Sequence, residues 1–573
     1  MAQYPHDGPY LVAGPLLRYV GDTCATVWVE TDRPCTVEVL GHRASTWGVH
    51  GHHYALVVVE GLRPGTETAY TVLLDGDRVW PEAGSPYPPS VVRTLGDDRR
   101  LRLAFGSCRR AAAFDRHSLR SVGADALVAL AQRMAGGDRT SWPDALLLLG
   151  DQVYADEPSP ALTKRLDRLT ELGRRRDEGA NDEVRDEIVD FEEYTWLYHE
   201  AWRTPDVRWL LSTVPTAMVL DDHDLRDDWN SSWSWRRRME QQPWWRERVE
   251  GAFASYWVYQ HLGNLSPERL AENVVYRRVL DAPDDEARER VLAEMAWRAD
   301  REPTSARWSF VRDLGRTRLV VIDSRCSRRL TPGDRAMVDD SEWDWVRESA
   351  QADVDHLLLG TSLPFLTLHG IHHLEGWDEA VAEGAWGRRA GRVAERLRLS
   401  ADLEHWPAFR RSFDGMVRLV QDVAGKARPP SSVLWLSGDV HCSYLARARV
   451  RDVDPDRTAV HQLTMSPFRN PLEPWLRFAN RVLERPRVVA VLAWLARRAG
   501  VVDPPLTWDV DQGPWFGNGL MTLVVDGPTA AVEVEQARVV AGLQVLERTY
   551  TGALTADRSG QRGAAGHRSG LPT

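Results

Sequence analysis

Several short apolar runs in this sequence end on side chains that can do chemistry. The clearest is "DALLLLGDQVYADE" at 144–157, in which four consecutive leucines are typical of a strand buried on both faces. Asp151 and Tyr154 follow that strand. Ligand sites of α/β sheets lie at the carboxyl ends of the strands, so such residues can converge on one site. Four more runs end in this way: "FGSC" on Cys108, "VLDDHD" on Asp221, Asp222, His223 and Asp224, "VIDSR" on Asp323 and Arg325, and "WLSGDVH" on Asp439 and His441.

Each of these motifs alone also has an ordinary structural explanation. A Gly-Asp pair after a strand is usually a turn, and the acidic run at 221–224 could cap a helix. Cys108 could be a small buried hydrophobe and His441 a core histidine. Cys108 is not a phosphatase-type nucleophile, because Phe114 stands where an arginine would follow. The combination of carboxylates, a thiol, a phenol and histidines at strand ends predicts a metal site.

The elements that position these residues form an α/β domain. From about residue 100, short apolar strands alternate with helical stretches, which indicates a layered α/β architecture. Charged, Trp-rich helical insertions are expected at 157–212, 230–305 and 375–425. The predicted strands are "LRLAFGSC", "DALLLLGD", "TAMVLDDH", "RLVVIDSR", "HLLLGTSLP", "VLWLSGDVH" and "AVHQLTMSP", with "LMTLVVDG" and "AAVEVEQA" as a closing hairpin.

A smaller β domain precedes this part of the chain. Short alternating runs separated by turn residues cover residues 10–95, and "GLRPGTETAYTVLLDG" resembles the late hairpin of a fibronectin-type sandwich. The predicted organisation is an all-β sandwich domain at 1–95, a catalytic domain at 96–545 and a disordered tail at 546–573.

Composition narrows the classes of function. The net charge of −11 over 573 residues argues against general nucleic-acid binding. Neither a signal peptide nor an apolar run long enough to span a membrane is visible, and the longest candidate, "VVAVLAWLA" at 488–496, predicts a packed or amphipathic helix. Five scattered cysteines fit a reducing compartment, so a cytoplasmic location is predicted. The sequence does not predict an oligomeric state.

The motif series resembles the alkaline phosphatase D (PhoD-like) family of the calcineurin-like metallophosphatases. Ordinary members of that superfamily carry Asp-x-His, Gly-Asp-x-x-Asp, Gly-Asn-His-Asp/Glu and Gly-His-x-His. The PhoD-like branch replaces His by Cys, Asp by Tyr, Asn by Asp and His by Asp, and this sequence makes all four replacements. The matching stretches lie in order between about 100 and 470: Gly106 to Cys108, Gly150 to Tyr154, Asp221 to Asp224 and Gly438 to His441.

The resemblance implies a four-layer α-β-β-α sandwich with a two-metal centre. Asp151 would bridge the two metals. A thiolate and a phenolate suit Fe³⁺ in the first site, with Zn²⁺ as the alternative, whereas carboxylates in the second site favour Ca²⁺, Mg²⁺ or Mn²⁺. The first site would be formed by Cys108, Asp151, Tyr154 and His441, and the second by Asp151, Asp222 and Asp439.

Such a centre implies metal-dependent hydrolysis of phosphoric esters, mono- or diesters, by a hydroxide held between the metals. Arg325 would clamp the phosphate oxygens, unless it only pairs with Asp323. His223 would protonate the leaving oxygen, with Asp224 orienting it. The alternative is a degenerate metallophosphatase fold that acts as a non-enzymatic binding or scaffold protein.

Substrate contacts carry weaker signals. The stretch "LHGIHHLEGWDE" could line the pocket through His372, His373 or Trp377, or form a surface helix. The segment at 227–247, "DDWNSSWSWRRRMEQQPWWRE", could form a rim for a small, nucleotide-like phosphoester, or pack its tryptophans into the core. "SPFRNP" could add Arg469 or Asn470, and the histidines of "VHGHHY" are read as a chance strand face.

Overall fold

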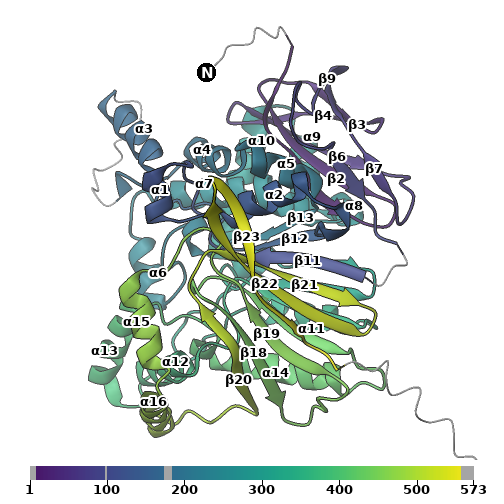
Figure 1. Ribbon diagram of the computed structural model, residues 1–573. Coiled ribbons are helices and arrows are strands. Elements are labelled where there is room, and N and C mark those ends of the chain that lie inside the picture. The colour runs from purple at the N-terminus through teal and green to yellow at the C-terminus, as the bar shows by residue number, and fades with distance from the viewer. Residues whose placement is uncertain (1–7, 97–99, 173–183, 557–573) are drawn as a thin grey trace, which may run out of the picture.

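The computed structural model describes residues 8–96, 100–172 and 184–556, and it begins with a small all-β domain (Figure 1). Two four-stranded sheets pack face to face, and alternate residues such as Val37 and Val39 point into the core between them. The predicted all-β domain is confirmed. One sheet contains β1 (Leu11–Val20), β2 (Ala25–Thr31), β6 (His52–Val59) and β5 (Trp47–Val49); the other contains β4 (His42–Ser45), β3 (Thr36–Val39), β8 (Val72–Leu74) and β9 (Asp77–Trp80); β7 (Glu67–Ala69) pairs with β10 (Val91–Arg93).

Two larger mixed sheets form the centre of the remaining chain (Figure 1). In the first, β11, β12 and β13 run parallel; in the second, β15, β16, β17 and β19 do. The first sheet has the order β13 (Thr216–Val219), β12 (Ala145–Leu149), β11 (Arg100–Gly106), β21 (Gly519–Asp526), β22 (Thr529–Val540) and β23 (Leu543–Ala553). The second has the order β14 (Phe310–Leu314), β15 (Thr317–Ile322), β16 (His356–Thr361), β17 (Ser432–Ser437), β19 (Ala459–Thr464), β18 (Ser443–Val450) and β20 (Leu506–Trp515).

The leucine run of β12 explains how the layers are built. Leu147 and Leu149 belong to the core between the two sheets, whereas Leu146 and Leu148 face the helices outside the first sheet. Successive strand residues point to opposite faces, so a strand in the middle of four layers must be apolar at every position. The predicted four-layer α-β-β-α fold is therefore confirmed.

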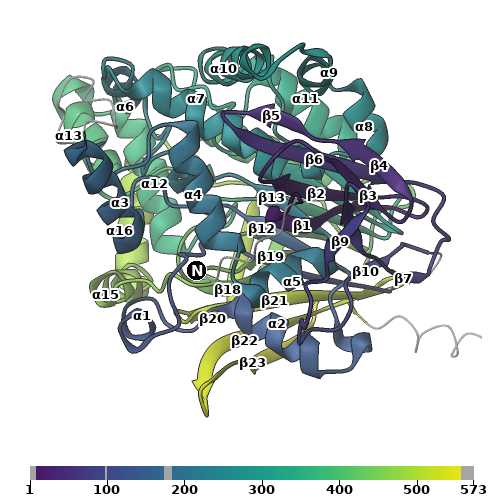
Figure 2. The ribbon, with the colours of Figure 1, turned by 90° about the horizontal axis from the view of Figure 1, so that it is seen from above.

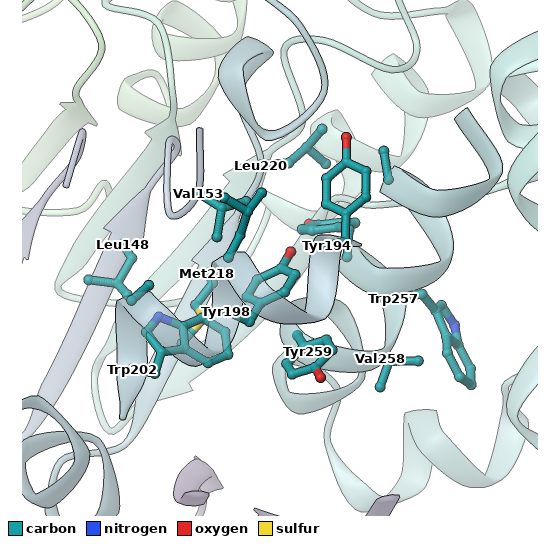
Figure 3. Packing of buried hydrophobic residues seen from close by; sticks show 14 of the residues in the cluster. Leu148, Val153, Tyr194, Tyr198, Trp202, Met218, Leu220, Trp257, Val258 and Tyr259 are labelled. Carbon is teal, nitrogen blue, oxygen red and sulfur yellow. The ribbon is translucent and has the colours of Figure 1, made fainter. Parts of the chain in front are cut away.

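Helices cover the outer faces of both sheets (Figures 1 and 2). In Figure 3, Tyr198 and Trp202 of α4 (Phe191–Trp202) lie near Met218, and the ring of Tyr259, from the π-type turn Trp257–His261, stacks on Tyr198 at 4.3 Å. The first sheet is covered by α2 (Ala126–Gly136), α4 (Phe191–Trp202), α5 (Pro205–Thr213) and α7 (Trp245–Tyr256), the second by α11 (Asp340–Ser349) and α14 (Arg410–Ala424).

The remaining helices lie mostly in the expected insertions. None of the helices among the described residues has the length and apolarity to cross a lipid bilayer, and "VVAVLAWLA" falls in the amphipathic α16. These helices are α1 (Arg116–Ser121), α3 (Pro160–Glu171), α6 (Trp233–Met239), α8 (Pro267–Glu272), α9 (Val274–Asp281), α10 (Asp285–Arg301), α12 (His369–Ala382), α13 (Gly387–Ser400), α15 (Pro474–Leu483) and α16 (Pro486–Arg498).

The disordered tail was predicted to begin at residue 546, which is too early. β23 continues to Ala553 because its residues pair with β22 along the edge of the first sheet. The rest of the predicted tail, 557–573, lies outside the described residues.

A buried glutamate joins the β domain to α4. Glu30 of β2 accepts hydrogen bonds from His52 Nδ1 at 2.7 Å and from His199 Nε2 of α4 at 2.8 Å. His52 Nε2 lies 2.7 Å from Glu192 Oε2 of α4. The stretch "VHGHHY" was interpreted as a chance strand face. That interpretation was wrong, because His52 contacts Glu30 of the β domain and Glu192 of α4.

These contacts make the stability of the fold depend on pH. Glu30→Gln should reduce both the stability and its dependence on pH. Burial raises the pKa of Glu30, but the bonds from His199 and His52 lower it to about 2; burial lowers the pKa of His52, but Glu192 and Glu30 raise it to about 9. The contribution of Glu30 is therefore present above pH 4.5 and lost as pH falls toward 2. That of His52 is present below pH 6.5 and lost as pH rises toward 9.

We expect Glu30→Gln to lower the midpoint of thermal unfolding at pH 6.5 and to flatten its decline toward pH 9. Differential scanning calorimetry across this range measures both effects. Superimposable curves for the two proteins would contradict the proposed contact.

Candidate metal centre

The strand ends that converge here share an unusual backbone conformation. Positive φ angles occur at Cys108 (56°), Asp151 (50°), Asp439 (65°) and His441 (47°). Non-glycine residues rarely adopt this left-handed region, and such strain concentrates at functional sites. Hydrogen bonds between the segments hold it in place, for example from Cys108 N to Gly150 O at 3.3 Å.

Two glycines allow the segments to approach each other. A Cβ on Gly438 would lie 2.2 Å from the side chain of Ser107, and one on Gly150 would lie 2.6 Å from Cβ of Asp221. Ser107 Oγ also accepts a hydrogen bond from Asp439 N at 2.9 Å. The glycines of the sequence motifs are thus required by backbone contact between different strand ends.

One group of ligand atoms lies where β11, β12 and β17 end. The donor atoms of Cys108, Asp151 and His441 lie within 4.8 Å of one another, with Cys108 Sγ 3.3 Å from Asp151 Oδ2. The buried Tyr154 hydroxyl accepts a hydrogen bond from Asn470 Nδ2 at 3.1 Å. Asn470, a weak candidate for the pocket in the sequence, therefore acts on Tyr154.

The electrostatics of this group fit a cation. Burial, then the charges of Asp151 and Asp439, hold the pKa of the Cys108 thiol well above its ordinary value. Burial and the charges of Asp151 and Cys108 do the same for the Tyr154 phenol. A cation among these groups would stabilise the thiolate and phenolate that their surroundings otherwise disfavour.

A second group consists of three buried carboxylates and includes Asp221, a strand-end residue that was not predicted as a ligand. Asp151, Asp221 and Asp222 place ligand oxygens within 4.8 Å of one another, and Asp151 thus belongs to both groups. Asp151 Oδ1 and Asp221 Oδ2 are buried without a hydrogen-bond partner among the described residues. Burial and the charges of Asp221 and Asp222 hold the pKa of Asp151 well above the usual range, although His223 lowers it. Three such carboxylates fit a hard cation.

Arg325 does not have the predicted geometry of a phosphate clamp. Its side chain is completely buried and contacts Asp221, with Nη2 3.0 Å from Asp222 Oδ1 and Nη1 2.5 Å from Glu404 Oε1. Asp323, its predicted ion-pair partner, instead accepts a hydrogen bond from its backbone N–H at 2.9 Å. Arg325 therefore holds Asp221 and Asp222, two carboxylates of the second group.

Asp439 belongs to a network of buried charged side chains that was not predicted. Its Oδ2 lies 3.3 Å from His405 Nε2, its Oδ1 lies 3.7 Å from Arg325 Nη2, and His405 Nδ1 lies 2.5 Å from Glu375 Oε1 of α12. Burial raises the pKa of Asp439, but His405 and Arg325 lower it below the carboxyl range. Asp439 is thus held ionised, but among the described residues it does not belong to the second group, for which it was predicted.

His223 is oriented by Asp156 and not, as predicted, by Asp224. Nδ1 of His223 lies 3.0 Å from both carboxylate oxygens of Asp156. Asp224 is instead used by the backbone, since its Oδ2 accepts from Asp221 N at 2.9 Å. Burial lowers the pKa of His223, but Asp156, Asp222 and Asp151 raise it well above its ordinary value.

If the chain is a hydrolase in which His223, kept protonated by Asp156, donates a proton, Asp156→Asn should lower kcat by about 10²-fold. Loss of its charge lowers the pKa of His223, so the alkaline limb of the pH–rate profile should move to lower pH. Steady-state kinetics between pH 6 and 10 measure both, with Asp156→Glu as the charge-preserving control. An unmoved alkaline limb would contradict this role.

The three predicted substrate residues have different surroundings, and only the backbone of Arg469 touches a ligand residue among the contacts of the described chain, since its N–H donates to Cys108 O at 3.1 Å. His373 borders a small crevice with Arg410 and Asp503, and Trp377 contacts Trp386, with ring centroids 5.6 Å apart. Arg469 is buried and donates to backbone carbonyls, including that of Ala112 at 2.6 Å. The predicted contact of Arg469 with substrate is therefore contradicted, because its guanidinium is used within the chain.

The Trp-rich segment 227–247 mostly packs into the core. This agrees with the alternative reading of that segment, except for Trp233, whose side chain is 41% exposed. The buried tryptophans are Trp229, Trp235, Trp244 and Trp245.

Comparisons with known proteins find family models and solved structures that resemble this chain. Residues 128–280 match the family model described as PhoD-like phosphatase, and residues 8–92 match a domain of unknown function (DUF7800). No curated protein sequence matches the chain. A solved structure described as "Structure of PhoD" aligns with 97% of this chain and 92% of its own, at 11% identity and a TM-score of 0.55. A purple acid phosphatase from yellow lupin (Lupinus luteus) seeds aligns with 96% of this chain and 74% of its own, at 10% identity and a TM-score of 0.46.

Proposed function

We propose that this chain, which carries a PhoD-like phosphatase domain, hydrolyses phosphoric esters at a centre for two metal ions. The observation that carries the proposal is that Asp151 belongs to both ligand groups, a mixed one with a thiol and a histidine and one of carboxylates alone. A shared carboxylate is what two cations at close range require.

The donor types assign a different cation to each group. Cys108, Asp151, Tyr154 and His441 would hold Fe³⁺, with Zn²⁺ as the alternative, because thiolate and phenolate donate strongly. Asp151, Asp222 and Asp439, together with Asp221, would hold Ca²⁺ or another hard divalent cation. When bound, the two ions supply Lewis acidity to the phosphoryl oxygens and lower the pKa of water.

His223 supplies a proton in this scheme. The carboxylate of Asp156 fixes Nδ1, which leaves Nε2 as the atom that donates to the leaving oxygen of the ester. The charge of Asp156 raises the pKa of His223, which favours the protonated imidazole. Arg325 keeps Asp221 and Asp222 in place and does not touch the substrate.

The substrate class is a small phosphoester, and both mono- and diesters are tested. The purified chain is assayed with bis-p-nitrophenyl phosphate and p-nitrophenyl phosphate, before and after chelation, and after return of iron with calcium, zinc or manganese. We expect hydrolysis to be lost on chelation and restored by metal. A protein that binds metal but hydrolyses neither these esters nor a panel of nucleotides would instead be the non-enzymatic scaffold.

A further inference from the structure

A second cavity lies away from both ligand groups, between α6, α12, α13 and the segment after β15. Its volume is about 670 Å³, which is in the range of small-molecule sites. Figures 1 and 2 both show α6 close to α13. The cavity is lined by Trp233, Ser234, Leu330, Pro332, Arg335, Ala382, Glu383, Gly384, Arg388, Gly391, Arg392, Glu395 and Arg398.

Two of the lining arginines are buried and incompletely paired. The side chains of Arg335 and Arg398 are 4% and 3% exposed. Arg335 Nε and Arg398 Nη2 have no hydrogen-bond partner among the described residues. Burial and the neighbouring charge of Arg398 lower the pKa of Arg335 to about 9, although Glu379, 4.0 Å from its Nε, raises it. An anion in the cavity would relieve both the desolvation and the repulsion of these guanidinium groups.

Two more arginines stand at the mouth of the cavity. Arg388 and Arg392 are exposed and lie one turn apart on α13, so their side chains share a face of the helix. Neither forms an ion pair within the described part of the chain. The two acidic lining residues are engaged, since Glu383 accepts from Gly333 N at 2.6 Å and Glu395 pairs with Arg398 at 3.2 Å. Four arginines thus line the cavity against two acidic residues, while Glu379 and Asp378 outside the lining lie 4.0 and 3.2 Å from Arg335 and Arg398.

An aromatic wall completes the cavity. Trp233 begins α6, lines the cavity and remains 41% exposed, unlike the other tryptophans of its segment. Arg237 lies 5.7 Å from the centroid of its ring. An exposed indole beside arginines is suited to stack on a nucleobase while the arginines pair with phosphate.

We propose that this cavity binds a nucleoside phosphate, with its phosphates on the four arginines and its base against Trp233. The site is distinct from the proposed catalytic centre, because none of its lining residues belongs to either ligand group. It can still influence that centre, since Arg335 Nη2 lies 3.4 Å from Ser231 O, in the segment that follows Asp222.

Calorimetric titration with adenosine diphosphate tests the proposal. All proteins carry Asp151→Asn, so that the probe is not turned over. Arg388→Ala/Arg392→Ala removes two cavity charges, and Arg389→Ala/Arg396→Ala removes two exposed charges of the same helix that do not line the cavity. We expect the first pair to weaken binding by at least about tenfold and the control pair to leave it unchanged.

The Trp233→Ala variant tests the contact with the base separately from the contacts with phosphate. It should weaken binding of adenosine diphosphate but not of inorganic phosphate. Equal losses with both arginine pairs would mean non-specific charge attraction and would overturn the site, as would the absence of binding. A Trp233→Ala protein that binds the nucleotide normally would overturn the stacking of the base.

Discussion

Replacing Asp151 with asparagine should lower turnover of a chromogenic phosphodiester by about 10³-fold, because the change removes the one carboxylate shared by both ligand groups. Lewis-acid stabilisation by a metal is worth several kcal/mol, and about 4 kcal/mol corresponds to this factor. The amide keeps the size of the side chain, and the pKa of Asp151 is already raised by burial, so the neutral form costs the fold little. Far-ultraviolet circular dichroism and steady-state kinetics test both statements.

The matched control for this variant is Asp281→Asn at the exposed end of α9. It makes the same chemical change on the surface and should leave turnover within about twofold of the parent protein. A folded Asp151→Asn protein with parental activity would contradict the bridging role, whichever metal it contains.

Replacing Arg325 with leucine should destabilise the chain by about 3–5 kcal/mol, the cost of breaking a buried ion-pair network. Its fully buried guanidinium faces four carboxylates, those of Asp221, Asp222, Glu404 and Asp439. Without it, these groups remain buried with less positive charge nearby. Urea unfolding in the presence of chelator measures the loss, and added divalent cation should recover part of it, since metal supplies charge to the same carboxylates.

A surface arginine provides the comparison. Arg449 pairs with Asp509 at 2.7 Å but is 64% exposed, so Arg449→Leu should change stability by less than about 1 kcal/mol. If Arg325→Leu instead unfolded like the parent and only raised KM, Arg325 would be the phosphate clamp that the sequence suggested.

The sequence could point to candidate ligand positions because they follow strands with strong local signals. The four leucines of β12 specify a strand between two layers, and the glycine motifs mark where chain segments meet. Strands with weaker apolar patterns were not predicted; β14, β18, β20 and β23 alternate charged with apolar residues and lie at or near sheet edges.

Residues that act through distant partners could not be predicted. His405 and Glu375 meet Asp439 only because α12 and the chain after α13 fold over the end of β17. Asp156 was missed although it stands in the same motif as Asp151, since nothing in the spacing places it beside His223. Arg325 was predicted as a residue of the site. The position of its guanidinium group, however, depends on four carboxylates from three other segments.

The metal content of the chain purified without added metal tests the central claim most directly. Elemental mass spectrometry of the parent and of Cys108→Ala should give close to one equivalent of iron in the parent, with a second divalent ion, and loss of iron in the variant. Zinc or manganese in place of iron would keep the two-metal centre but overturn the assignment of the first site. A parent protein that holds no metal after reconstitution would contradict the account.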